Sequence, residues 1–365
     1  METSDRDMSA SDGGRLEWID AWKGVLIVLV VAGHVCGGLS HVCEGWAKAA
    51  CEICYKMIYF FHMPAFFWIA GLCWRTRGDS FAAFAKRRAR RLLVPYAVFG
   101  VASVLVYAAA SGAAASLDAH ASDGYYAAMG AIPLWKQLLA LVHAGGWPDG
   151  EGFRCNSVLW FLPTMFTTSC LYFWLDRLLP SRRGQLAVAL LLLPAFWLCR
   201  RIGCPGLPWG LSLAGWYLPF VVFGRWLRLG DSARVRGGGA MILAGWLAYG
   251  VAAHLEPNTW LGVPKFGWFA VFTGMTVWGL ALCAWSVRRL RGRTMRLFAA
   301  LGLASMGVML MHKFLVLGLQ LKVPLVRELA GRGGLATCAA ALAILVGATG
   351  ASYVVSKLPF VRRIV

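Results

Sequence analysis

The dominant feature of this 365-residue sequence is a succession of apolar runs of bilayer-spanning length, which begins at Gly24 and continues to the C-terminus. A membrane-spanning helix needs about 20 mostly apolar residues, and fewer where the helix is short or broken. Hydrophobic residues make up 59% of the chain and charged residues 15%, whereas soluble domains have about 45–50% and about 25%. The sequence therefore predicts an all-α, polytopic integral membrane protein, and it excludes disordered, collagen-like and small disulfide-stabilised proteins.

The apolar runs divide into about ten predicted transmembrane helices. They cover residues 24–41, 53–73, 92–112, 157–175, 185–200, 208–226, 238–254, 266–286, 297–318 and 334–355. Residues 1–20 lack the basic segment and the cleavage site of a signal peptide, so we interpret them as a polar cytoplasmic tail. Residues 21–365 then form a single transmembrane domain, with one long outer loop at about 111–157 that is expected to be functional.

The formal net charge of +19 must be reconciled with a membrane environment. A nucleic-acid-binding protein would have a solvated basic face, but here Lys and Arg gather in short clusters in every second connection, such as KRRARR at 86–91. Cytoplasmic loops of membrane proteins carry this excess. The alternation predicts that both termini are cytoplasmic, that the protein lies in the inner or plasma membrane, and that nucleic acid is not a partner. Arg200 and Arg201 depart from the pattern.

Eleven cysteines give no recognisable disulfide or metal framework. Those inside predicted spans are expected to pack as small apolar side chains. One or two disulfides are possible among those in outer connections, but their pairing cannot be deduced from sequence. Cys51 and Cys54 form a C-x-x-C pair without a second pair at zinc spacing, so we expect no metal.

Three histidines fall inside predicted spans, where an ionisable side chain is costly and is a functional candidate by default: His34, His62 and His312. Lys23 precedes His34 by eleven residues, which places both on one helix face about 16 Å apart. This geometry suits a long anionic ligand with its charged end at Lys23 and its reactive end at His34. The alternative is a lysine that extends to the membrane surface and a histidine satisfied by a neighbouring helix.

The other two histidines have sequence neighbours that could serve chemistry or packing. Pro64 removes a helical hydrogen bond and bends the helix beside His62. Ser305 lies seven residues before His312 and shares its helix face. Either pair could equally provide hydrogen bonds between helices.

Two further clusters lie at the ends of predicted spans. Arg88 and Arg91 are one helical turn apart and could bind phosphates bidentately, although most such clusters only set topology or contact anionic lipid. Trp160 and Phe161 belong either to an aromatic belt at the outer membrane surface or to a platform on which a sugar ring stacks.

Taken in chain order, these segments resemble the membrane acyltransferase family 3, and within it the branch of fucose 4-O-acetylase-like proteins. DAWKG at 20–24 with His34 resembles the family's D-x-x-[KR]-G and V-x-x-G-H. The further matches are FFHMPAFFWIAG at 60–71, RRARRLLVPY at 87–96, VLWFLP at 158–163, LPFVVFGRWLR at 218–228 and LGLASMGVMLMHKFL at 301–315. The resemblance covers essentially the whole chain.

The resemblance implies an integral-membrane O-acetyltransferase that transfers an acetyl group from acetyl-CoA to a carbohydrate or glycolipid acceptor of the cell envelope. It implies that His34 is catalytic and that Lys23, Arg88 and Arg91 hold the donor's phosphates. Apart from the resemblance, we expect His62 and His312 to orient His34 or to bind the acceptor. Trp160, Phe161 and Ser305 are expected at the acceptor. The sequence departs from the family pattern at Lys23, Ala70 and Met309, where Arg, Ser and Tyr are common.

Two other classes are compatible with these residues. A carrier or flippase for a lipid-linked sugar would use buried histidines as a proton relay and should show an inverted repeat, which is not visible. A non-catalytic membrane scaffold would not require Lys23 and His34 on one face. The acceptor sugar, the acyl group, a direct or a two-step transfer, and the oligomeric state are not determined by the sequence.

Overall fold

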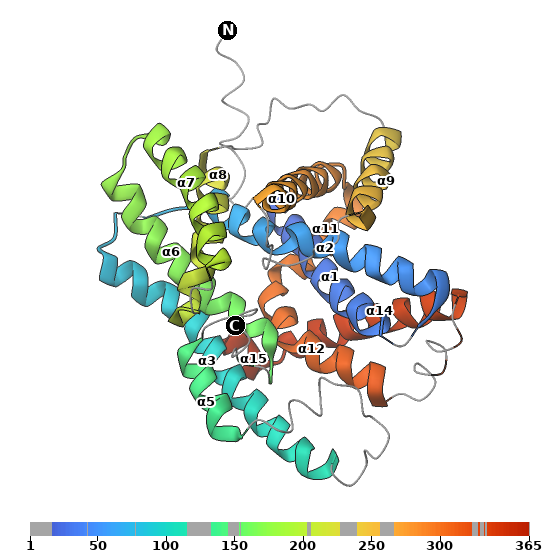
Figure 1. Ribbon diagram of the computed structural model, residues 1–365. Helices are drawn as coiled ribbons and strands as arrows, with labels where there is room; N and C mark the ends of the chain where they lie inside the picture. Colours follow the sequence, from blue (N-terminus) through green and yellow to red (C-terminus); the bar gives the residue numbers. More distant parts are fainter. Residues whose placement is uncertain are drawn as a thin grey trace.

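In the computed structural model, every element of the described residues is helical, which confirms the predicted all-α class (Figure 1). The structure describes residues 17–364 apart from 42, 77, 115–132, 145–152, 154, 203–205, 227–238, 256–265, 323–327, 329–331 and 333. Most of the predicted tail at 1–20 and most of the predicted outer loop at 111–157 therefore lie outside the described residues.

The predicted apolar runs coincide with helices along the whole chain. The helices are α1 (Glu17–Leu39), α2 (Gly45–Leu72), α3 (Phe81–Ala114), α5 (Leu134–His143), α6 (Phe161–Leu178), α7 (Arg182–Arg201), α8 (Leu211–Trp226), α9 (Gly239–Leu255), α10 (Phe266–Val287), α11 (Gly292–Leu303), α12 (Ser305–Lys322), α14 (Gly334–Ser356) and α15 (Pro359–Ile364). Short 3-10 turns, η2 (Ser157–Trp160) and η3 (Pro208–Gly210), precede α6 and α8.

Six helices of the described residues are long and apolar enough to cross a membrane, and a seventh span results if α11 and α12 are counted together. The protein is therefore a multi-pass membrane protein, and ten crossings with cytoplasmic termini stay a prediction. The predicted span at 297–318 is not one straight helix, because the chain bends by 79° between α11 and α12. Local apolar character cannot reveal this bend, since it occurs where α11 packs against α1.

Helix α1 is the centre of the molecule and packs against α2, α10, α11, α12 and α14. Trp22, Leu26, Ile27 and Val31 of α1 have no exposed surface. In Figure 1, α6, α7 and α8 lie on one side of the α1–α2 pair, and α9 and α10 lie on the other. Both ends of α1, including Lys23 and His34, are thereby surrounded by helices from distant parts of the chain.

Two pairs of glycines allow helices to touch backbone to backbone. A Cβ atom on Gly24 would overlap the carbonyl of Phe298 in α11, and one on Gly302 would overlap the carbonyl of Asp20 in α1. Gly71 of α2 and Gly224 of α8 form the same kind of reciprocal contact. Small residues promote such close packing in membranes, where a hydrophobic driving force between helices is absent.

Helix α5, within the predicted outer loop, packs against the middle of α3. The Tyr96 hydroxyl donates a hydrogen bond of 2.6 Å to the Leu141 carbonyl, and the Leu141 side chain lies against Gly100. The opposite face of α5 is apolar and exposed, with Trp135, Leu139 and Val142 more than half exposed. This part of the predicted outer loop is therefore a helix attached to a membrane span.

Candidate active site

Two of the three histidines singled out by the sequence lie side by side, and a tyrosine links them to the third. The rings of His34 on α1 and His312 on α12 have centroids 5.1 Å apart. The Tyr59 hydroxyl of α2 lies 3.4 Å from Nδ1 of His34, and the Tyr59 ring packs edge-on against His62 at 4.9 Å. His62 and His312 are almost fully buried.

The hydrogen bonds of the three imidazoles differ. Nδ1 of His62 donates to the Ile58 carbonyl at 2.8 Å, and Nδ1 of His312 donates to the Val308 carbonyl at 3.0 Å. Because a carbonyl only accepts, each of these Nδ1 atoms carries a hydrogen, which leaves Nε2 as the basic nitrogen of the neutral ring. His34 makes no bond to a carbonyl of its own helix within the described residues. The hydrogen-bonding neighbour of its Nδ1 atom is instead the Tyr59 hydroxyl of α2.

His312 has an unused acceptor next to His34. Its Nε2 atom is buried and has no hydrogen-bond partner among the described residues. An unpaired buried polar atom is costly and is expected to have a function or a missing partner. The His34–His312 pair therefore offers a hydroxyl-bearing molecule one free acceptor beside a titratable imidazole.

The segment before α6 closes this site from the side of α12. Asn156 donates from Nδ2 to the Leu310 carbonyl at 3.1 Å, and Lys313 binds the Ser157 hydroxyl. Oδ1 of the fully buried Asn156 lacks a partner among the described residues. Burial raises the pKa of the Cys155 thiol to about 11, against the opposing charge of Lys313, so this thiol stays neutral at pH 7.

Sequence reasoning missed Tyr59, Asn156 and Lys313. Lys313 is an ionisable residue inside a predicted span, so the criterion that selected His312 should have selected it too. Tyr59 lies one helical turn before His62, on the same face. Asn156 had no signal, because its place beside α12 depends on contacts between segments more than 150 residues apart.

A basic cluster lies around the N-terminal part of α1. The charged neighbours of the Cys73 thiol are Lys23, Asp20, Arg75 and Arg88, so residues from α1, α3 and the end of α2 meet there. Lys23 forms an ion pair of 3.3 Å with Asp20. The Arg88 guanidinium lies over the rings of Trp74 and Phe84, at 5.7 and 5.5 Å.

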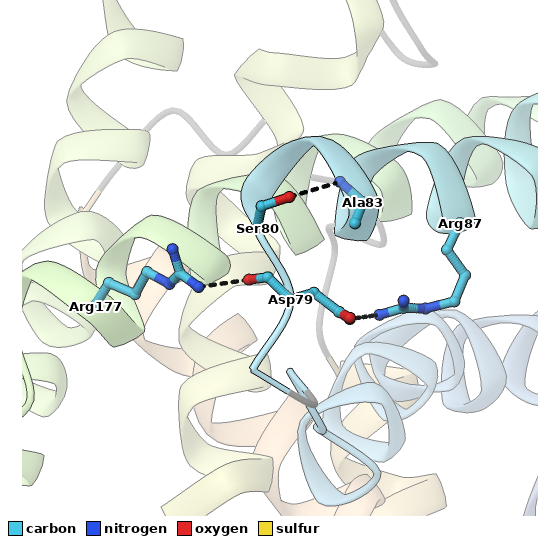
Figure 2. Close-up of polar contacts among 5 residues, drawn as sticks. All are labelled: Asp79, Ser80, Ala83, Arg87 and Arg177. Atoms are coloured by element: carbon cyan, nitrogen blue, oxygen red, sulfur yellow. Dashed lines mark hydrogen bonds and ion pairs between the residues drawn. The ribbon is translucent and has the colours of Figure 1, made fainter.

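The arginines near the start of α3 differ in whether they are bound by a carboxylate. No carboxylate of the described residues pairs with Arg88, and Arg91 is exposed. Arg87, by contrast, is bound by the Asp79 carboxylate, while the Asp79 carbonyl accepts a hydrogen bond from Arg177 of α6 (Figure 2). These contacts hold the start of α3 against α6 and leave Arg88 available for a ligand.

Of the three residues predicted at the acceptor, Trp160 and Phe161 are neighbours, with ring centroids 6.3 Å apart, but their rings pack against different partners. The half-buried Trp160 ring stacks on Tyr217, with centroids 5.8 Å apart and planes at 24°. Phe161 is buried and packs against Phe66 and Phe67. Ser305 begins α12 directly after the bend, two helical turns before His312. Of the three, Trp160 has the partly exposed ring that stacking requires.

The described residues contain no group of three or more His, Cys, Asp or Glu side chains that could hold a metal ion. The comparisons with known proteins give one match. A family model described as an acyltransferase domain matches residues 16–357, which include the histidines and the basic cluster. Neither a curated protein nor a solved structure matches the chain.

Proposed function

The chain belongs to the acyltransferase domain family whose model spans nearly all of it, and from this premise we propose that it transfers an acetyl group from acetyl-CoA to a carbohydrate hydroxyl of the cell envelope or an exopolysaccharide. Membership makes the protein a membrane acyltransferase. The acetyl group, the carbohydrate or glycolipid acceptor, the role of His34 and the fucose 4-O-acetylase-like branch are our proposals.

The observation that carries the role of His34 is its hydrogen bonding. His62 and His312 are hydrogen-bonded to carbonyls of their own helices, whereas within the described residues His34 is not, and its ring centroid lies 5.1 Å from that of His312. A neutral imidazole with a free lone pair can remove the proton of an acceptor hydroxyl. The hydroxyl oxygen then forms a bond to the acyl carbon, the thioester C–S bond breaks, and the coenzyme leaves with a proton as the free thiol.

The basic cluster supports a coenzyme A thioester as donor. Such a donor supplies an activated acyl group on a long pantetheine arm that ends in phosphates. The span of about 16 Å along α1 between Lys23 and His34 matches an elongated ligand. Arg88 lacks a carboxylate partner among the described residues and offers a planar, bidentate phosphate contact, with Lys23 and Arg91 as additional charges.

The acceptor is placed near Trp160, whose half-buried ring is suited to stacking against a sugar. We propose that the outer loop at 111–157 borders this entrance, that residues 21–365 act as one transmembrane domain, and that lipid covers the exposed apolar faces.

The test compares His34→Ala with His254→Ala, which removes an exposed imidazole at the end of α9. Each variant is expressed in a host lacking the native protein, and surface glycans are analysed by mass spectrometry. We expect wild-type and His254→Ala to restore O-acetylation, and His34→Ala to lower it by at least about 100-fold. Unchanged O-acetylation by correctly inserted His34→Ala would exclude its catalytic role.

One observation favours a carrier or flippase of a lipid-linked sugar, namely the 79° bend between α11 and α12, since broken helices occur in transporters. Purified protein in nanodiscs separates the two functions, because nanodiscs allow acyl transfer but enclose no compartment. Acetylation of the acceptor in nanodiscs supports the enzyme. Lipid-linked sugar movement in vesicles without acetylation supports the carrier.

A further inference from the structure

Two tyrosines of α2 fit into a notch on α1 beside His34. Gly33 and Gly37 are four residues apart and lie on one helix face. A Cβ atom on Gly33 would lie 2.8 Å from the Tyr59 ring, and one on Gly37 would lie 3.1 Å from the Tyr55 ring. Any larger residue at either position would push a tyrosine away from α1, so the glycines let both rings lie directly against it.

The notch places the two tyrosine hydroxyls in series with His34. The rings of Tyr55 and Tyr59 have centroids 4.0 Å apart, so the two side chains lie next to each other on one face of α2. The Tyr59 hydroxyl in turn lies 3.4 Å from Nδ1 of His34. This distance is long for a hydrogen bond, but contacts in catalytic sites often shorten only when substrate binds.

We propose that Tyr59 is a positioning residue that holds His34 as the Nδ1–H tautomer and so directs the Nε2 lone pair to the reacting hydroxyl. In this arrangement the Tyr59 hydroxyl donates a hydrogen bond to the Tyr55 oxygen, and the Tyr59 oxygen accepts a hydrogen bond from Nδ1–H of His34. The inference rests on His34 being the catalytic base in the proposed acyl transfer. It adds how that base is oriented.

The proposal explains why α2 and not α1 provides the partner of His34. In His62 and His312, a carbonyl four residues earlier fixes the Nδ1–H form. Such a bond also fixes the ring against its own helix. A tyrosine on the neighbouring helix fixes the same tautomer without holding the imidazole against its own helix. A hydrogen bond to one ring nitrogen of a histidine determines which nitrogen is left as the reactive one.

The experiment reads the tautomer directly. Protein labelled with [15N]histidine is reconstituted in lipid vesicles, and solid-state NMR distinguishes protonated from unprotonated Nδ1. His34→Ala assigns the His34 signals. Tyr59→Phe removes only the hydroxyl. Tyr249→Phe is the matched control, because the Tyr249 hydroxyl of α9 donates to the Met57 carbonyl of α2, the helix that carries Tyr59.

We expect protonated Nδ1 at His34 in the wild type and in Tyr249→Phe, and a shift to the Nε2–H form in Tyr59→Phe. The signals of His62 and His312 should stay unchanged, which reports that the fold is intact. An unchanged His34 tautomer in Tyr59→Phe, or protonated Nε2 at His34 in the wild type, would overturn the proposal. If Tyr59→Phe does not fold, Gly33→Ala tests the same contact, since it displaces the Tyr59 ring and should cause the same shift.

Kinetics separate this proposal from the proposed function. Tyr59→Phe should lower kcat by about 10- to 100-fold with little change in KM for the donor, because binding of phosphates does not involve His34. A tautomer shift without any acetyl transfer by the wild type would refute the proposed function and keep the role of Tyr59. Normal acetyl transfer by the wild type without a tautomer shift in Tyr59→Phe would keep the proposed function and refute the role of Tyr59.

Discussion

The histidine cluster, formed by Tyr59, His34, His62 and His312, and the basic cluster, formed by Lys23, Arg75, Arg88 and Arg91, are built on opposite principles. In the first, the rings of three helices are in contact and His62 and His312 are almost completely buried. In the second, Lys23 is paired with Asp20 and its side chain is about 30% exposed, and Arg91 is exposed. Chemistry needs fixed geometry, whereas flexible charges are sufficient to bind a polyanion.

The largest effect is expected from a change at the contact between α11 and α1, the helix that contributes residues to both clusters. Gly302→Ala would force the backbones of α11 and α1 apart, because the new Cβ atom would overlap the Asp20 carbonyl. We expect a loss of about 1–3 kcal/mol or more of unfolding free energy, seen as a lower Tm in detergent, with lower activity from both clusters.

The control for Gly302→Ala is Gly350→Ala on α14, where an added Cβ atom meets nothing within 4 Å. Its Tm should stay equal or rise slightly, since alanine is the better helix former. A Tm for Gly302→Ala equal to that of Gly350→Ala would show that α1 and α11 do not pack as the structure has them.

The sequence was sufficient to predict the helices, because they depend on local patterns. Apolar runs predict spans, and the eleven-residue spacing of Lys23 and His34 follows from one helix. The contact of Gly302 with α1, a helix about 280 residues earlier in the chain, was not predictable in this way, and neither was the bend between α11 and α12.

The same limit applies to the partners of His34. His62 and His312 were selected as costly ionisable groups, but periodicity reports only the face of a helix and never what that face meets. Tyr59 was missed for this reason. The glycines at 33 and 37 were a usable signal, because paired small residues one turn apart indicate a close helix contact, and the tyrosines at 55 and 59 have the matching spacing.

An intermediate effect is expected within the basic cluster, and neighbouring arginines provide the control. Arg88→Gln should raise KM for the donor by about 10- to 100-fold with kcat nearly unchanged, because a charge-assisted contact to phosphate contributes about 1.5–3 kcal/mol. Arg87 is bound to Asp79 (Figure 2), so Arg87→Gln should leave KM within about twofold and reduce stability by no more than about 1 kcal/mol. Equal KM values for the two variants would remove Arg88 from the donor site.

The smallest effect is expected at Lys23, and it tests whether the basic cluster tolerates imprecision. Lys23 already shares its charge with the buried Asp20 carboxylate at 3.3 Å, so it has less charge to offer a phosphate. Lys23→Ala should therefore weaken acetyl-CoA binding by only about threefold to fivefold, as measured by isothermal titration calorimetry. Lys23→Arg should bind at least as tightly as the wild type, because a guanidinium can hold Asp20 and a phosphate together. If Lys23→Ala instead lowered kcat as His34→Ala is expected to, Lys23 would belong with the fixed geometry of the histidine cluster, and the contrast between the two clusters would fail.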